Sequence, residues 1–379
     1  MARVYLDWNA TTPPLEAVSE AMAEAAREAW GNPSSVHATG RAARARVEDA
    51  RAAIAELMEA DPRDVVLTSG GTEANNLALR SAFADGKGGM LVTSRLEHPS
   101  VARVAEALER EGRARLEWIS VREDGRVDVD HIARALRQGG VRLVAVQAVN
   151  HETGVIQDVG AIAELAREHG AALHVDAIQS IGRLANVHPG ADTRSVAAHK
   201  MRGPKGIGAL VLRPGAHISP ILVGGSQERG VRPGTVDPIA AAGFGVAARH
   251  ARSSPSRYAA LAALRDVLER ILVECSGARV NGTAARAPHI TNVACAGWAG
   301  PELAAALDLE GISISSGSAC SAGTSEPSPV LQAMFGVNTA DDARPTSSVR
   351  FSLGELTTEG EIATATAAFA RVMARARAS

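Results

Sequence analysis

Short apolar runs alternate with longer amphipathic stretches along the first part of the chain. A run of four to eight apolar residues that ends at a turn is typical of a buried strand, whereas apolar residues at helical spacing predict a helix. Strands are therefore predicted at residues 65–68, 90–93, 142–149, 171–175 and 207–212, and helices at 14–30, 42–58, 77–83, 159–168 and from Pro99 onward. This alternation indicates an α/β fold with a mainly parallel sheet covered on both faces.

The pattern changes in the last third of the chain. A long helical region runs from Ile239 to about Glu274 and is interrupted near Pro255. Shorter elements follow, and they predict a smaller α+β domain: strands near 290–293 and 348–352, and helices at 301–309 and 359–375. We expect a large domain at residues 14–245 and a small C-terminal domain at 246–379, joined by the N-terminal segment 1–13.

Polar residues follow the predicted strands of the large domain. Because the carboxyl ends of parallel strands lie at one edge of a sheet, such residues are expected to lie close together at the mouth of a site. The residues in these positions are Gly71, Thr72, His98, Asn150, His151, Asp176 and Lys200. Their convergence on one edge favours a functional site over isolated surface residues.

The stretch from Ala171 to Leu210 contains the most informative pair. A buried strand ends at Asp176, and Lys200 precedes a Gly/Pro turn that leads into another strand. A carboxylate for a pyridinium nitrogen and a lysine for an aldehyde are what pyridoxal phosphate (PLP) requires of a protein.

Residues 69–76, SGGTEANN, connect a predicted strand to a predicted helix. A glycine turn at a helix N-terminus can bind an anion through free backbone N–H groups and the helix dipole. The same segment equally fits a simple strand-to-helix connection. It is not a GxxxxGK[ST] loop, which argues against a nucleoside triphosphate.

Composition excludes several classes of function. The 40 Lys+Arg nearly balance the 42 Asp+Glu, so charge gives no reason to expect nucleic acid or an acidic membrane surface as a partner. No apolar run approaches membrane-spanning length, and the N-terminus lacks an apolar signal core. The three cysteines are too few and scattered for a disulfide framework or a CxxC metal site, so a cytoplasmic protein is expected.

Ten stretches resemble one family of enzymes. They are YLDWNATTP, GNPSSVH, TSGGTEANNLAL, EHPSV, NHETGVIQ, HVDAIQS, AHKMRGPKGIGAL, GGSQERGVRPGT, SSGSACSAGTSEPSPVL and VRFSLG, and they run from Tyr5 to Gly354. The chain resembles the cysteine desulfurases among the class-V aminotransferase-like, fold-type-I PLP enzymes. The SSGSAC stretch resembles the group with a long cysteine loop. The resemblance implies a large domain with a mainly parallel seven-stranded sheet and a smaller α+β domain.

The resemblance also implies residue roles. Lys200 would bond to the cofactor aldehyde, Asp176 would pair with the pyridinium nitrogen, and His98 would stack on the ring and shuttle protons. Cys320 would be the nucleophile, in a Gly/Ser loop that a buried structural cysteine rarely occupies. Gln179 and His151 would contact the cofactor ring. The phosphate would be held by Gly71, Thr72, His199 and, across a homodimer, Thr235. The substrate would be bound by Arg350, Asn150 and Asn32.

The activity that the resemblance implies is conversion of L-cysteine to L-alanine, with the sulfur transferred to Cys320 as a persulfide. The product would serve iron–sulfur cluster or thio-cofactor biosynthesis through an acceptor such as an iron–sulfur scaffold protein. No resident metal site is expected, although Cys320 is a candidate transient ligand of an iron–sulfur cluster.

Two positions depart from the family pattern. His151 stands where the family usually has a second Asn, and Ala197 stands where it usually has a Ser that donates to the phosphate. These changes leave two alternatives open. One is a selenocysteine lyase or related PLP enzyme, and the other is a low-activity paralogue that acts as a sulfur-transfer partner.

Overall fold

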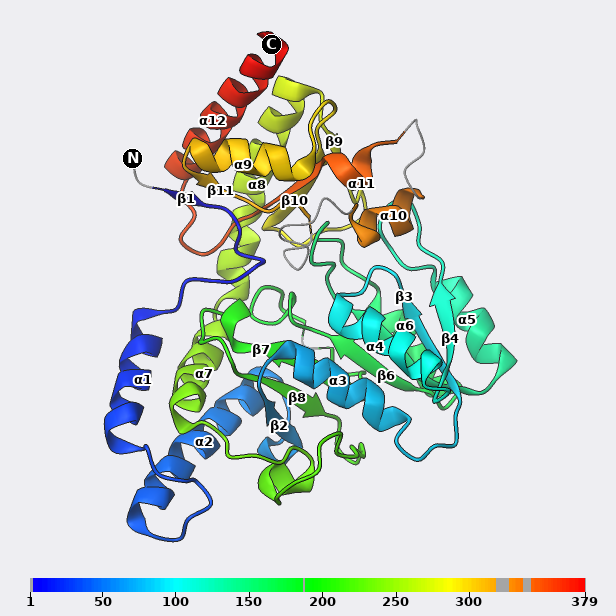
Figure 1. The fold of residues 1–379 in the computed structure, drawn as a ribbon, viewed down its shortest axis with the longest axis vertical. Helices are drawn as coiled ribbons and strands as arrows, with labels where there is room; N and C mark the ends of the chain where they lie inside the picture. Colours follow the sequence, from blue (N-terminus) through cyan, green and yellow to red (C-terminus); the bar gives the residue numbers. More distant parts are fainter. Residues whose placement is uncertain (1–2, 187, 318–326, 337–341, 379) are drawn as a thin grey trace.

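The computed structural model describes residues 3–186, 188–317, 327–336 and 342–378. A seven-stranded sheet, in the order β2-β8-β7-β6-β5-β3-β4, forms the centre of the larger part (Figure 1). Strand β8 is antiparallel to both of its neighbours, and the other pairs are parallel. The predicted α/β fold with a mainly parallel sheet is therefore confirmed.

The strands of this sheet are β2 (Val65–Thr68), β3 (Met90–Ser94), β4 (Arg115–Ile119), β5 (Val141–Gln147), β6 (Ala172–Asp176), β7 (Thr193–Ala197) and β8 (Gly208–Leu212). The helices of this part are α1 (Glu16–Glu28), α2 (Ala38–Leu57), α3 (Gly71–Ala82), α4 (Pro99–Arg110), α5 (Val129–Gln138), α6 (Val159–Glu168) and α7 (Pro238–Ala251), with short 3-10 turns η1 (Pro62–Asp64), η2 (Ala198–Lys200) and η3 (Gln227–Gly230).

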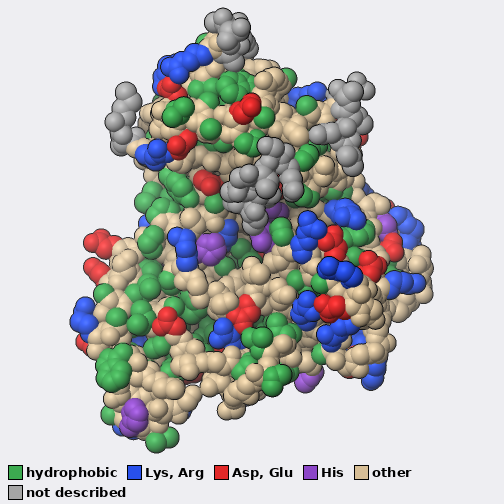
Figure 2. All heavy atoms as spheres, in the orientation of Figure 1, with side chains coloured by type: hydrophobic (Ala, Val, Ile, Leu, Met, Phe, Trp, Pro, Cys, Tyr) green, Lys and Arg blue, Asp and Glu red, His purple; other side chains and the backbone are tan. Residues whose placement is uncertain are grey.

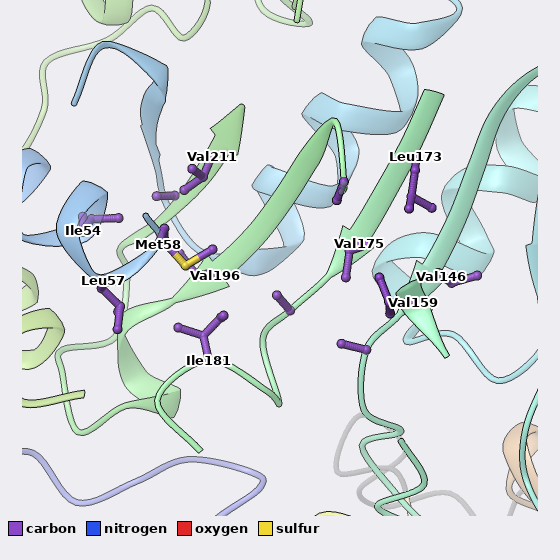
Figure 3. Close-up of a cluster of buried hydrophobic side chains, with 14 of the residues drawn as sticks. Ile54, Leu57, Met58, Val146, Val159, Leu173, Val175, Ile181, Val196 and Val211 are labelled. Carbon is purple, nitrogen blue, oxygen red and sulfur yellow. The ribbon is translucent and has the colours of Figure 1, made fainter. Parts of the chain in front are cut away.

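Successive side chains of a strand point to opposite sides of the sheet, and both faces are covered along the strands other than β4. Val65 and Leu67 of β2 pack in a cluster with α2, α5, α6 and α7, part of which is drawn in Figure 3. Val66, between them, packs in a second cluster with α3 and α4. Apolar residues are thus needed at consecutive positions of β2, which explains its apolar run Val65–Leu67.

The smaller part has its own core around an antiparallel sheet of β9 (Arg279–Val280), β10 (Ile290–Ala294) and β12 (Ser348–Ser352). Strand β1 (Val4–Tyr5) joins it by pairing with β11 (Ile312–Ser313). The other elements of this part are α8 (Pro255–Ser276), α9 (Gly300–Leu309), α10 (Pro329–Phe335), α11 (Arg344–Ser347) and α12 (Glu359–Ala378). In Figure 1 the segment that contains β1 runs from this part down to α1.

Some elements differ from the sequence prediction. Helix α3 begins at Gly71, six residues before its predicted start, because the glycine turn itself opens the helix. Strand β4 and helix α5 were not predicted, and no strand was predicted at the position of β7, which is buried but has the sequence TRSVA without a continuous apolar run. β4 is an edge strand with Arg115 exposed, so it lacks the continuous apolar run of its neighbours. The division at residue 245 stays a prediction; it would cut α7, a single helix whose side chains through Ala251 pack in the core of the larger part.

Candidate active site

The carboxyl ends of the parallel strands face one cavity of about 290 Å³, close to the usual lower size of a small-molecule site. Histidine side chains are visible in this region, between the two parts of the molecule (Figure 2). Arg350 from β12 also lines the cavity, so both parts contribute to it. The predicted site residues that line it are Gly71, Thr72, His98, His151, Asp176, Gln179, His199, Lys200 and Arg350.

One end of the cavity is formed by the start of α3. No side chain caps this helix, so its first N–H groups can serve a ligand. Gly71 is required here, since a Cβ on it would lie 2.1 Å from Cδ1 of Ile178. The nearby Ala197 side chain lines the same region without offering a hydrogen bond. This end suits a phosphate group, with one donor fewer than the family pattern provides.

Asp176 lies at the last position of β6 and is 6% exposed. Its Oδ2 accepts a 2.8 Å hydrogen bond from Nδ2 of Asn75, and its Oδ1 accepts one of 3.0 Å from the backbone N–H of Ile178. These two donors fix the orientation of the carboxyl group. The structure thus presents a fixed carboxylate to the cavity.

Lys200 ends the 3-10 turn η2 that follows β7. Its ammonium Nζ donates to the backbone carbonyls of Asn9 and Ala10, the latter over 3.0 Å. The N-terminal segment therefore contributes a wall of the cavity, a contact between residues 190 positions apart. These neutral carbonyls hold the amine next to the cavity without forming an ion pair with it.

Two imidazoles occupy the centre of the site. His98 and His151 meet edge to face, with ring centroids 5.4 Å apart. Burial lowers the pKa of His98; Lys200 adds to this effect and Asp176 opposes it. Burial lowers the pKa of His151 much further, with the positive charges of Arg350 and Lys200 contributing. Both rings are therefore held neutral at physiological pH.

Arg350 is 2% exposed, on a strand whose five residues are all buried. Its Nη2 donates to Oδ1 of Asp7, and its Nη1 donates to the carbonyl of His151, each over 2.7 Å. The guanidinium is thus oriented by partners from two distant segments. An arginine fixed in this way can bind a carboxylate through its remaining N–H groups.

His199 and Gln179 also line the cavity. Burial and the nearby Lys200 lower the pKa of His199 to about 4, and its Nδ1 lies 3.2 Å from the hydroxyl of Thr11. Gln179 donates to the carbonyl of Asn9 over 3.1 Å and accepts from Arg183. Both side chains are oriented by hydrogen bonds before any ligand binds.

Asn150, predicted to contact substrate, lies outside the lining of this cavity. It is fully buried. Its Nδ2 donates to the carbonyl of Leu96, and its Oδ1 accepts from Glu152 and Thr153. The side chain therefore holds the loop that presents His151, and a contact of Asn150 with substrate stays a prediction.

Two other predicted residues, Asn32 and Thr235, do not line this cavity. Asn32 is exposed, and its Oδ1 accepts from the backbone of Ser34 in the loop between α1 and α2. Thr235 is exposed on the loop before α7. Asn32 is thus not placed to touch substrate in the cavity of its own chain, contrary to the simplest form of the prediction. Cys320 lies outside the described residues.

Comparison with known proteins identifies the family. The model of the aminotransferase class-V family matches residues 4–364. The chain belongs to the class-V aminotransferase family. A cysteine desulfurase of Frankia sp. is 41% identical, over 99% of this chain and 92% of its own length.

Solved structures of this family have the same fold. A NifS-like protein from Rickettsia africae has a TM-score of 0.86 and 30% identity, over 98% of this chain and 99% of its own. A structure described as SspA in complex with cysteine has a TM-score of 0.80 and 30% identity, over 93% of this chain and 99% of its own. Within the class-V aminotransferases, the relatives are thus cysteine desulfurases, which confirms the resemblance read from the sequence motifs.

Several residues of this class-V aminotransferase were missed by sequence reasoning. Asn75 and Ser100 connect His98 to Asp176 through hydrogen bonds. Glu97 and Glu152 are fully buried, and burial raises the pKa of each carboxyl; Asp176 adds to the effect at Glu97. Glu97 and Ser100 lie close to the predicted His98 in the sequence. This proximity was the one feature of the sequence that could have identified them as site residues.

Within the described parts of the chain, no group of three or more His, Cys, Asp or Glu residues could hold a metal ion. The same ranges contain no helix with the length and apolarity needed to cross a membrane.

Proposed function

We propose that this protein is a PLP-dependent cysteine desulfurase that converts L-cysteine to L-alanine and transfers the sulfur to Cys320 as a persulfide. The observation that carries the proposal is the meeting of Asp176 and Lys200 in one cavity with the uncapped N-terminus of α3. Its donor set fits a phosphorylated pyridine aldehyde: a carboxylate, an amine and an anion site.

When bound, PLP supplies an aldehyde and an electron sink for the substrate carbanion. In the proposal Lys200 bonds to the aldehyde, Asp176 keeps the pyridine nitrogen protonated, and Gln179 and His151 hydrogen-bond to the ring oxygen. The N–H groups of Gly71 and Thr72, with His199, hold the phosphate. The buried environment that lowers the pKa of His199 favours its neutral form before a dianion arrives.

Arg350 binds the substrate carboxylate in this proposal. Its Nη1 and Nη2 are already oriented by His151 and Asp7, so little side-chain freedom is lost on binding. His98 lies at the centre of the same cavity, where it can exchange a proton with substrate. Cys320 attacks the substrate sulfur as a thiolate, the nucleophilic form of cysteine.

We further propose a homodimer in which Thr235 reaches the phosphate of the partner. Large hydrophobic side chains are exposed on the same segments as Asn32 and Thr235: Trp30 is 69% exposed, Val36 86% and Val223 105%. Residues beside both positions, Pro33 and Val236, line one surface hollow, so the two loops lie together. Exposed apolar groups of this kind favour association.

The dimer has a direct test. A Lys200→Ala chain and a Thr235→Ala chain are each expected to retain PLP poorly. If Thr235 contacts the phosphate in the partner's site, a dimer of one Lys200→Ala chain and one Thr235→Ala chain contains one complete site. The cofactor absorbance and the activity of this mixed dimer should then recover to about half those of the wild type. No recovery after subunit mixing, or a monomer in sedimentation, would contradict the arrangement.

In the cell we propose a cytoplasmic enzyme whose sulfur acceptor is a protein such as an iron–sulfur scaffold. The acceptor is proposed from family resemblance alone.

The activity is tested with purified protein. A visible absorbance that borohydride abolishes, followed by equal yields of alanine and sulfide from L-cysteine with a reductant, is the expected result. Cys320→Ala should keep the absorbance and lose sulfide production, whereas the matched control Cys275→Ala should keep both. Alanine and sulfide from Cys320→Ala at the wild-type rate would overturn the role of Cys320. Turnover of selenocysteine without turnover of cysteine would instead indicate a lyase, and absorbance without either product a sulfur-transfer partner.

A further inference from the structure

A chain of hydrogen bonds links the imidazole of His98 to the carboxylate of Asp176. Nδ1 of His98 lies 2.8 Å from the hydroxyl of Ser100. That hydroxyl lies 2.8 Å from Nδ2 of Asn75, which also lies 2.8 Å from Oδ2 of Asp176. Asn75 and Ser100 are buried, so neither exchanges these partners for water.

Chemistry fixes the orientation of the Asn75 amide. An ionised carboxylate only accepts hydrogen bonds, so the group facing Asp176 is the NH2 group. Its second N–H donates to Ser100, whose oxygen is thereby an acceptor. The amide oxygen faces Nε2 of His174 at 3.0 Å, and that nitrogen can donate because Nδ1 of His174 faces the hydroxyl of Thr193. Every polar group of this network has a compatible partner.

The direction of the network reaches His98. Because the Ser100 oxygen already accepts from Asn75, its own proton is available to donate to Nδ1 of His98. The backbone N–H of Ser100 points to the same nitrogen at 3.1 Å, and an N–H group cannot accept. His98 is in fact the N-cap of α4 through this contact. Two donors on Nδ1 require a lone pair there, so the proton of the neutral ring is on Nε2.

We propose that Asn75 and Ser100 are positioning residues that hold neutral His98 as its Nε2–H tautomer, so that Nε2 donates a proton and does not accept one. The charged and titratable groups around this ring are Asp176, Lys200 and His151, with Glu97 adjacent in the chain. The lowered pKa of His98 agrees with a neutral ring. The consequence for catalysis rests on the proposed function, but the tautomer does not.

If His98 is a donor at Nε2, it cannot act as the first base of the reaction from this nitrogen. A proton added to the neutral ring would go to Nδ1, and it would displace both donors of Ser100. His98 is therefore set to deliver a proton in the reaction, and removal of the substrate Cα proton falls to another group that lines the cavity, for which the Lys200 amine is placed.

The test is a long-range proton–nitrogen NMR spectrum of the full-length protein labelled with 15N-histidine, recorded without substrate. The His98 signals are assigned by their loss in His98→Gln. The expected pattern is one protonated Nε2 and one unprotonated Nδ1 near pH 7.5. A protonated Nδ1 in the neutral ring, or a ring charged at this pH, overturns the proposal. The wild-type spectrum alone identifies the tautomer of His98, so the result does not depend on whether a variant folds.

Variants then test the network itself. Ser100→Ala removes a donor that favours the neutral ring, so the midpoint of His98 titration should rise by roughly half to one pH unit. Ser100→Thr keeps the hydroxyl and should restore it. Asn75→Ala should shift the midpoint in the same direction, whereas the matched control Asn76→Ala, on the surface of the same helix, should not. Equal midpoints of His98 titration in the wild type, Ser100→Ala and Asn75→Ala would show that neither residue positions His98. Loss of desulfurase activity with an unchanged Nε2–H pattern would count against the proposed function alone.

Discussion

The imidazole of His151 lies edge-on to that of His98, at a centroid distance of 5.4 Å and an interplanar angle of 74°. The side chain of His151 is buried, since the residue is only 8% exposed. Its backbone carbonyl accepts from Arg350 and from Asn9, so a side-chain substitution leaves these two contacts in place. A substitution of His151 therefore tests the role of its imidazole ring without removing these two backbone contacts.

His151→Asn should give a pH profile of kcat/KM with the same shape as that of the wild type between pH 6 and 9. The pKa of His151 lies well below its usual value, because burial and nearby positive charges disfavour the imidazolium. The ring is therefore already neutral throughout this range, and its replacement removes no titration. Steady-state alanine formation measured across the range checks this; an acidic limb present only in the wild type would contradict it.

His151→Ala should be less active than His151→Asn. The amide can replace the hydrogen bond of the imidazole to a charged oxygen, whereas the methyl group cannot. Such a bond contributes about 1.5–3 kcal/mol, so kcat/KM should fall roughly 10- to 100-fold in the Ala variant only. Equal losses in the two variants would show that the ring acts by shape and not through a hydrogen bond.

Ala197→Ser should increase the affinity for PLP. Ala197 lines the phosphate end of the cavity beside the uncapped start of α3, and a hydroxyl there adds a donor to a dianion. A charged hydrogen bond of about 1.5–3 kcal/mol corresponds to roughly 10- to 100-fold tighter binding. Fluorescence titration of the cofactor-free protein measures this. Ala198→Ser, at the next residue and outside the cavity lining, is the control and should bind no more tightly than the wild type.

Although β7 is buried at every position, its sequence TRSVA gives no apolar run, and it was not predicted. Strands such as β2 could be predicted, because apolar residues occupy most of the run. β4 could not, since an edge strand with exposed Arg115 lacks that signal. Strand ends also located the site residues, because the carboxyl edge of a parallel sheet gathers side chains whose order in the sequence is known.

Side-chain direction could not be read from the sequence. Asn150 and His151 are adjacent, yet only His151 faces the cavity, because the amide of Asn150 is used to close the loop. Asn75 and Asp176 are 101 positions apart, and their contact depends on how α3 lies across the sheet. Local patterns predicted which segments meet, whereas the partners of each polar atom required the fold.

His174 should make the protein less stable in mild acid. Burial lowers its folded-state pKa to about 3, whereas an unfolded histidine titrates near 6.5. Between these values the unfolded chain binds the proton and the folded chain does not, so stability falls as the pH falls. From pH 7.5 to pH 5 the loss attributable to this group is about 2 kcal/mol.

Urea denaturation of the wild type and His174→Gln at both pH values measures this contribution. The variant should show a smaller loss of unfolding free energy on acidification, by about 2 kcal/mol, whatever its stability at pH 7.5. His169→Gln, at an exposed position after α6, is the matched control and should keep the wild-type loss. A loss in His174→Gln as large as in the wild type would refute the assignment.

Glu228→Gln should be strongly destabilising. Its carboxylate pairs with the guanidinium of Arg51 through bonds of 2.6 and 2.8 Å, with the two side chains 3% and 6% exposed, and it also accepts from the backbone of Leu67. Removing one charge of a buried pair leaves the other uncompensated, at a cost of about 3–5 kcal/mol. Glu48→Gln removes a 56% exposed partner of the same arginine and should cost less than about 1 kcal/mol. Urea denaturation of both variants measures the contrast, and similar costs would show that burial does not determine the strength of this pair.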